Sequence, residues 1–302
     1  MKKQVRAVTE GAMMLAMVGL FLYINRLSGH AFDGILSFMM PLPAVFYIAK
    51  YGFKQGLILA GSMLLLGLII ADPISMFYVI TAVVVGLIYG YGIYKDKDNG
   101  WLLFWTTVLT AISFFIEMVL LANFFGYNYT NEVSVLIETL QGMGVNNLPD
   151  NIDTLILSIY PLAMLMTAFI QALVTHILAT ILLKRLQIKT RSMKPLSQIY
   201  LPKKIALLLA LGLFANFGVK MTNDETIQII LTNIGFFSML MFCIDAYIFM
   251  LIIAKISRKS YLGILSVLLF LFIPYVGVAI GMFDSFTDLR KRVLYTYAQP
   301  TE

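Results

Sequence analysis

Two acidic residues interrupt long apolar stretches of this sequence. Glu117 lies well inside the run 101–125, and Asp245 lies inside the run 226–254. A carboxylate in hydrocarbon is energetically costly, so such a group usually faces protein or a water-filled cavity. Each of the two residues can bind a ligand or couple the movement of a proton or ion, and each can instead make a structural hydrogen bond between helices. The residue types alone leave both interpretations open.

Two amide side chains occupy comparable positions. Gln171 lies inside the run 154–184, and Asn123 lies near the end of the run 101–125. Amides in membrane segments commonly form hydrogen bonds with neighbouring helices, but they also provide polar contacts that orient a small ligand. We therefore expect Glu117, Asn123 and Gln171 to line an outward-facing pocket for a small-molecule ligand.

The residues that carry catalysis or hold metals are sparse. The sequence has no Walker A motif, no His-Glu-x-x-His, no Gly-x-Ser-x-Gly and no Cys-x-x-Cys. Its one cysteine is Cys243, and its two histidines, His30 and His176, lie far apart in the chain. We expect no catalytic residues, no metal site, no cofactor, no ATPase activity and no enzyme activity.

The composition requires lipid as the solvent for most of the surface. Of the 302 residues, 60% are hydrophobic and only 13% are charged, whereas about 25% of the residues in soluble proteins are charged. The net charge of +6 comes from basic residues at the ends of apolar runs, a pattern that argues against nucleic acid as a partner. A soluble domain is excluded, and membrane lipid is the expected partner.

The apolar runs predict an all-α, polytopic bundle of transmembrane helices. A span needs about 20 residues, and only helices or closed barrels satisfy the backbone in lipid; barrel-like alternation is absent. The predicted spans are 8–26, 34–50, 55–71, 73–94, 101–125, 154–184, 204–220, 226–254 and 261–283.

Lysine and arginine alternate with the spans and predict an orientation. They gather at the N-terminus and in every second connection, and most densely in 184–204. The intervening loop 126–153 has four acidic residues and no basic one. Because basic loops stay in the cytoplasm, we expect a multi-pass protein of the bacterial cytoplasmic membrane with its N-terminus in the cytoplasm.

The last run breaks this charge pattern. If 261–283 crosses the membrane once, Arg290, Lys291 and Arg292 lie outside. Alternatively, the run is a hairpin bent at Pro274 that returns inside. By length we favour a full span.

The acidic loop 126–153 contains a second kind of helix. Between Asn131 and Met143, the apolar residues recur at helical spacing, so we expect a short amphipathic helix on the outer face. It either packs on the bundle or forms a gate over the ligand pocket.

Small residues form one stripe of the first helix. Thr9, Ala12, Ala16 and Gly19 recur at helical spacing, and small residues allow close approach of another helix. Ala12 and Ala16 are the predicted partner-helix contact, and packing within this same protein is the alternative.

Two regions resemble the YybS-like family of predicted bacterial membrane proteins. The first comprises Arg6-Ala7-Val8-Thr9-Glu10-Gly11-Ala12, Pro41-Leu42-Pro43 and Tyr51-Gly52-Phe53-Lys54-Gln55-Gly56. The second comprises Gly281-Met282-Phe283-Asp284 and Asp288-Leu289-Arg290-Lys291-Arg292. That family has no established function.

The first six segments also resemble the S components of energy-coupling factor transporters, which are six-helix proteins that capture vitamins from outside. Ala12 and Ala16 match the Ala-x-x-x-Ala motif that contacts the transmembrane coupling subunit in that family. The resemblance implies a coupling subunit with ATPases as partner. It implies an S-component-like region 1–190 and two or three additional helices in 191–302, a region in which this sequence departs from the family. No vitamin-specific motif is present.

Two functions therefore remain. The first is a substrate-capturing transporter component for a small molecule, without its own ATPase. The alternative is a non-transporting scaffold of the cell envelope, with 184–204 as its docking surface or as a site for anionic lipid.

Overall fold

The computed structural model describes residues 2–125, 129–144, 152–191, 198–287 and 289–298, and within these ranges every regular element is a helix. The predicted all-α polytopic fold is confirmed. The helices fall into two compact units. Unit 1 comprises 1–131 and 163–192, and unit 2 comprises 132–162 and 193–302. The proposed roles of 1–190 and 191–302 stay predictions.

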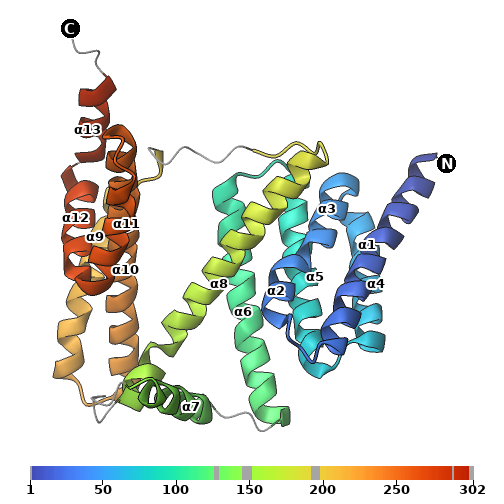
Figure 1. Cartoon of the computed structure of the whole chain (residues 1–302), viewed down its shortest axis with the longest axis horizontal. Coiled ribbons are helices and arrows are strands. Elements are labelled where there is room, and N and C mark those ends of the chain that lie inside the picture. Colours follow the sequence, from blue (N-terminus) through green and yellow to red (C-terminus); the bar gives the residue numbers. More distant parts are fainter. Residues whose placement is uncertain (1, 126–128, 145–151, 192–197, 288, 299–302) are drawn as a thin grey trace. The chain divides into compact units, whose positions relative to one another are not determined.

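Unit 1 contains the first six helices and most of the eighth (Figure 1). In chain order they are α1 (Lys2–Leu27), α2 (Asp33–Met39), α3 (Pro41–Tyr51), α4 (Phe53–Ile70), α5 (Pro73–Tyr94), α6 (Asn99–Phe125) and α8 (Ile152–Arg185) from Ala163 onward. The helix α3 is the centre of this unit, because eight of its eleven residues are buried. The predicted second span is thus two helices, α2 and α3.

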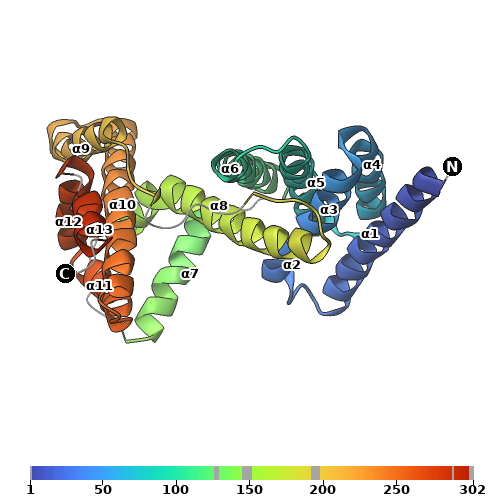
Figure 2. The ribbon, with the colours of Figure 1, turned by 90° about the horizontal axis from the view of Figure 1, so that it is seen from above.

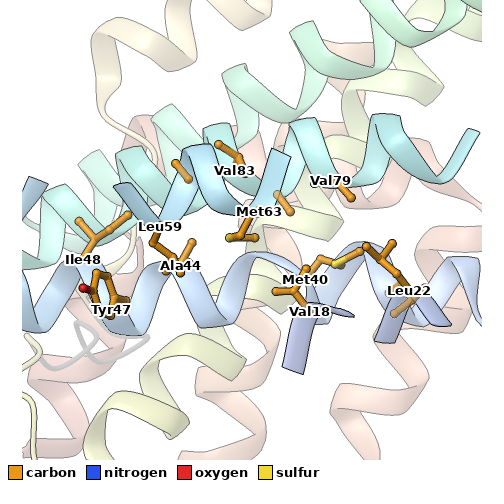
Figure 3. Close-up of a cluster of buried hydrophobic side chains, with 13 residues drawn as sticks. Val18, Leu22, Met40, Ala44, Tyr47, Ile48, Leu59, Met63, Val79 and Val83 are labelled. Carbon is orange, nitrogen blue, oxygen red and sulfur yellow. The ribbon is translucent and has the colours of Figure 1, made fainter. Parts of the chain in front are cut away.

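The core of unit 1 joins α3 to three neighbouring helices. Val18 of α1, Met63 of α4 and Val79 of α5 pack with Ile48 of α3 in one buried cluster (Figure 3). The α5 helix approaches α3 closely because Gly90 leaves room: a Cβ there would lie 2.7 Å from the Ile48 Cβ. Such close contact maximises dispersion attraction where no hydrophobic effect operates between helices.

Ion pairs tie together the basic end of unit 1. Lys50 donates to both carboxylate oxygens of Glu10 at 2.7 and 2.6 Å, and so joins the end of α3 to the start of α1. Arg191, after α8, makes two hydrogen bonds to the Asp96 carboxylate between α5 and α6, at 3.1 and 3.0 Å. Connections that share an excess of positive charge therefore share one end of this unit, while the N-terminal orientation stays a prediction.

Unit 2 is built around one long helix, α10 (Glu225–Ile256) (Figure 2). Against it pack α9 (Lys203–Gly218) and α12 (Pro274–Thr287), and around these lie η2 (Val219–Met221), α11 (Tyr261–Phe272) and α13 (Leu289–Ala298). The unit also includes α7 (Tyr129–Gly142) from Glu132 onward and the part of α8 that ends at Leu162. The helix α7 confirms the predicted short helix in the acidic loop; its role as a lid stays a prediction.

A polar bridge within unit 2 repairs the helix interruption at Pro161 in α8. A proline has no N–H and its ring disturbs the preceding turn. Asn233 of α10 inserts there: the Leu162 N–H donates to its Oδ1 at 3.0 Å, and its Nδ2 donates to the Ser158 carbonyl at 2.6 Å. The amide thus bridges the backbone on the two sides of Pro161.

The last predicted span is not straight, and this corrects our preference for a full span. The helices α11 and α12 are bent by 116° at the break before Pro274. Helix α12 then runs in the same direction as α10, because Gly281 packs against the Phe242 backbone and Ser285 donates to Asp245. The basic residues after α12 therefore lie at the end of unit 2 where α9 begins.

Among the described residues, the long apolar helices are fewer than the nine predicted spans. Within the described ranges, seven helical segments are long and apolar enough to cross a membrane, or eight if the bent pair counts as one span. Helix α9 is not among them because it has 16 residues, but η2 (Val219–Met221) continues it without a break toward Thr222, so that the two together approach the length of a span.

Candidate functional site

A cavity of about 420 Å³ lies in unit 1, between α2, α5, α6 and α8. Its polar lining comes from two carboxylates, an amide and three hydroxyls, and three large apolar side chains complete the wall. The lining residues are Asp33, Gly34, Ser37, Phe38, Tyr78, Phe114, Glu117, Thr167, Ile170 and Gln171. The cavity thus brings together Glu117 and Gln171, two of the three residues expected to bind a ligand.

Glu117 is the carboxylate of this cavity without a basic neighbour. It is half-buried on α6, and neither lysine nor arginine is among the lining residues. A carboxylate in an apolar wall needs water, a hydrogen-bond donor or a ligand to stabilise its charge. Glu117 therefore differs from the apolar residues that only pack helices together. Its place in the wall is compatible with a ligand-binding role, and its coupling role stays a prediction.

Asp33, the second carboxylate, is held at the start of α2 by two neighbouring side chains. Asn25 Nδ2 donates to Asp33 Oδ1 at 2.6 Å, and His30 Nδ1 lies 3.7 Å from the same oxygen. The other ring nitrogen of His30 lies 3.4 Å from Asp72 Oδ2. These contacts fix Asp33 at the wall of the cavity.

Asp72 immediately precedes α5 and lies between two candidate spans, where its carboxylate contacts His30. Its carboxylate accepts from the Ser75 N–H and hydroxyl, both at 2.9 Å, as an N-terminal cap does. Partial burial acts to raise the pKa of Asp72, but the hydrogen bonds from Ser75 and the nearby His30 outweigh it and lower this pKa below its ordinary value. The carboxylate is therefore ionised at neutral pH.

Gln171 lines the cavity and also connects two helices. Its Nε2 donates to the Ser37 carbonyl near the end of α2 at 3.2 Å, and the residue is 6% exposed. Thr167, one turn earlier on α8, lines the same wall. The structural and the ligand-binding interpretations of Gln171 are thus compatible. Asn123 lies on α6, but its side chain is outside the described residues.

Asp245 belongs to unit 2, and its surroundings differ from those of Glu117. Arg290 Nη2 lies 2.9 Å from Asp245 Oδ1 and 2.7 Å from Asp284 Oδ2, and Ser285 Oγ donates to Asp245 Oδ2 at 3.2 Å. All four residues are buried. Asp245 therefore has the interhelical partner that the structural interpretation requires, and its role in ion or proton coupling stays a prediction.

His176 is a buried packing residue of unit 1. The Tyr89 hydroxyl and His176 Nδ1 are 2.7 Å apart in a hydrogen bond, and both residues are at most 1% exposed. Neither is among the residues that line the cavity. This geometry agrees with the structural role that a histidine inside an apolar helix usually has.

Ala12 and Ala16 lie on an exposed stretch of α1, with Met13 and Met17 exposed beside them. The opposite side of the helix carries Gly11, which packs against the Tyr47 ring. The packing alternative within unit 1 is thus not realised at these two alanines, and contact with a partner helix stays a prediction. Among the described residues, no group of three or more metal-binding side chains could hold an ion.

Sequence comparison identifies the family. A family model described as "Predicted membrane protein (DUF2232)" matches residues 14–285. The chain belongs to the DUF2232 family. This DUF2232 protein is also 22% identical over 232 residues to the uncharacterized protein YybS of Bacillus subtilis strain 168, over 71% of this chain and 74% of the relative. The predicted YybS-like relationship is confirmed, and no solved structure matches the DUF2232 protein.

Proposed function

We propose that this DUF2232 protein captures a small organic cation in the cavity of unit 1, as the substrate-binding component of a transporter. The observation that carries the proposal is the joint position of Glu117 and Asp33 in one cavity wall. The protein has no ATPase of its own and catalyses no reaction. Its expected location is the bacterial cytoplasmic membrane.

The lining favours a positive ligand. Two carboxylates and no lysine or arginine face a space of about 420 Å³, a volume within the range of about 300–1,000 Å³ typical of ligand pockets. A cation would offset the cost of holding these carboxylates in an apolar wall. The rings of Phe38, Tyr78 and Phe114 add aromatic faces, which attract cations within about 6 Å.

Energy for transport would come from a partner. The sequence has no nucleotide-binding motif. The small, exposed side chains of Ala12 and Ala16 would allow a helix of a coupling subunit to approach closely. This subunit would in turn bind the ATPases.

Ligand capture can be tested by thermal unfolding of the full-length protein in detergent. We expect benzylammonium and related primary amines to raise the unfolding temperature, and neutral benzyl alcohol to leave it unchanged. Glu117→Gln should weaken cation binding about tenfold or more, because a charge-assisted contact contributes about 1.5–3 kcal/mol. Glu138→Gln, an exposed position on α7, is the matched control. Equal responses to cation and neutral compound would contradict the proposal.

The partner is tested separately. Ala12→Leu with Ala16→Leu should abolish co-purification of ATPase-containing subunits while the cation-induced thermal shift persists. Ala279→Leu, at an exposed helical alanine in unit 2, should affect neither property. Retention of the subunits by the double variant would exclude this surface as the contact.

A further inference from the structure

A second cavity, of about 430 Å³, lies in unit 2 at the end where α9 begins and α12 ends. Its wall comes from the segment before α9 and from the residues around the junction of α12 and α13. The polar lining consists of Gln198, Tyr200, Lys203, Ser285, Arg290 and Lys291, together with Asp284. None of these residues belongs to the cation cavity of unit 1.

Positive charge predominates in this lining. Three cationic side chains, those of Lys203, Arg290 and Lys291, face one carboxylate, that of Asp284. Lys291 Nζ also lies 5.4 Å from the centre of the Tyr200 ring, so the ring helps to hold the ammonium group near the cavity. The lining of this cavity is thus mainly positive, whereas the lining of the cavity in unit 1 is acidic.

Arg290 gives the cavity a rigid cationic wall. Its side chain is 4% exposed and is held by Asp245, Asp284 and the Ile199 carbonyl. Its Nε is buried and has no hydrogen-bond partner among the described residues. A buried donor without a partner is unfavourable, so a bound acceptor that reaches Nε would supply the missing hydrogen bond.

The surroundings connect this cavity to the membrane surface. It lies at the N-terminal end of α9, whose first two turns carry the exposed apolar residues Ile205 and Leu208. Apolar side chains next to lysines are the arrangement found where acyl chains meet phosphate headgroups. The basic stretch of sequence ends at this point with Lys203 and Lys204.

We propose that this cavity binds a phosphate group through Lys203, Lys291 and the wall formed by Arg290. Arginine and lysine donate charge-assisted hydrogen bonds to phosphate oxygens. The headgroup of an anionic phospholipid and free inorganic phosphate share this chemistry, and the experiment distinguishes them. The proposal is independent of cation capture in unit 1.

The test measures lipid binding to full-length protein in detergent by native mass spectrometry. We expect phosphatidylglycerol to bind more tightly than phosphatidylcholine. Lys203→Gln with Lys291→Gln should weaken phosphatidylglycerol binding about fivefold per lysine. Lys203→Arg with Lys291→Arg should restore it. The control, Lys255→Gln with Lys259→Gln, removes two exposed charges from unit 2 outside the cavity and should bind like the wild type.

Two further measurements complete the design. Lipid-free thermal unfolding of the Gln variant should match that of the wild type, which separates binding from folding. Titration with inorganic phosphate identifies the source: lysine-dependent stabilisation by phosphate alone assigns the site to a soluble anion, and its absence assigns it to lipid. Equal binding of the two lipids without a phosphate response, or equal losses in the Gln and control variants, would overturn the proposal.

Discussion

Arg290 of α13 and Asp245 of α10 form a buried ion pair 45 positions apart in sequence, with 2.9 Å between Nη2 and Oδ1. Asp284 shares the same guanidinium at 2.7 Å. Two carboxylates and one guanidinium thus occupy the interior of unit 2, where each charge depends on the others.

The Arg290→Gln substitution should therefore destabilise the protein severely. Removal of one partner from a buried ion pair costs about 3–5 kcal/mol, because a charge is left uncompensated. Chemical denaturation in detergent measures the change, and Lys259→Gln at an exposed position serves as control. Addition of Asp245→Asn should recover part of the loss. Additive losses in the double variant would show that the two residues are not coupled.

The Asn233→Ala substitution should weaken unit 2 by a different route. It removes the hydrogen bonds that Asn233 makes with the Leu162 N–H and the Ser158 carbonyl. Each lost bond to a buried group costs about 1–3 kcal/mol. Thermal unfolding should show this loss and a near-neutral effect of Thr232→Ala, the polar neighbour in sequence. Equal stability of the two variants would show that the Asn233 bridge does not stabilise α8.

The Tyr89→Phe substitution tests the buried pair in unit 1. Loss of the hydroxyl leaves His176 Nδ1 without its partner at 2.7 Å, at a cost of about 1–3 kcal/mol. Tyr94→Phe, at a 52% exposed residue of the same helix, should change stability little. Combination of Tyr89→Phe with His176→Leu should recover part of the loss, since the imidazole that loses its partner is then absent.

Acid should weaken the start of α5. The pKa of Asp72 is lowered in the folded protein, so its contribution is present above the ordinary value of 3.8 and is lost as pH falls through the folded pKa. Asp72→Ala removes the cap at neutral pH, at a cost of about 0.5–2 kcal/mol. Unfolding temperatures measured from pH 7 down to pH 3 should therefore converge for wild type and variant. A constant difference over this range would contradict a role for the ionised carboxylate.

The reversal between α11 and α12 makes a topological prediction. In a Cys243→Ala background, Lys259→Cys and Lys291→Cys should both resist a membrane-impermeant maleimide in intact cells and react after permeabilisation. Thr222→Cys, at the other end of α10, should react without permeabilisation. Reaction of position 291 but not 259 in intact cells would show instead that the 261–283 run crosses the membrane once.

The sequence predicts helices well because lipid permits few alternatives. The range 73–94 was predicted as a span, and α5 has the same bounds, Pro73 and Tyr94. The preference for a full 261–283 span was wrong because the length of an apolar run does not reveal a turn within it. The turn at Pro274 is held by long-range contacts, above all those of Gly281 with Phe242 and of Arg290 with Asp245.

The cavity of unit 1 was only partly predictable. Glu117 and Gln171 are conspicuous because each interrupts an apolar run. Asp33 is not, since an acidic residue at the start of a helix is ordinary. Tyr78 gave no signal among 16 tyrosines. Their meeting in one wall depends on the packing of α2, α5, α6 and α8, which no local pattern contains.

The ion pair in unit 2 also constrains the order of biogenesis. During synthesis Asp245 of α10 leaves the ribosome 45 residues ahead of Arg290, the residue that neutralises it. A carboxylate at the centre of an inserting helix costs about 2.5–3.5 kcal/mol, so α10 must be inserted by virtue of its remaining apolar residues. Asp245 then lacks its counter-ion until α13 has been made and packed. An insertase or chaperone that shields Asp245 during this interval would bind an intermediate that is absent from the folded protein.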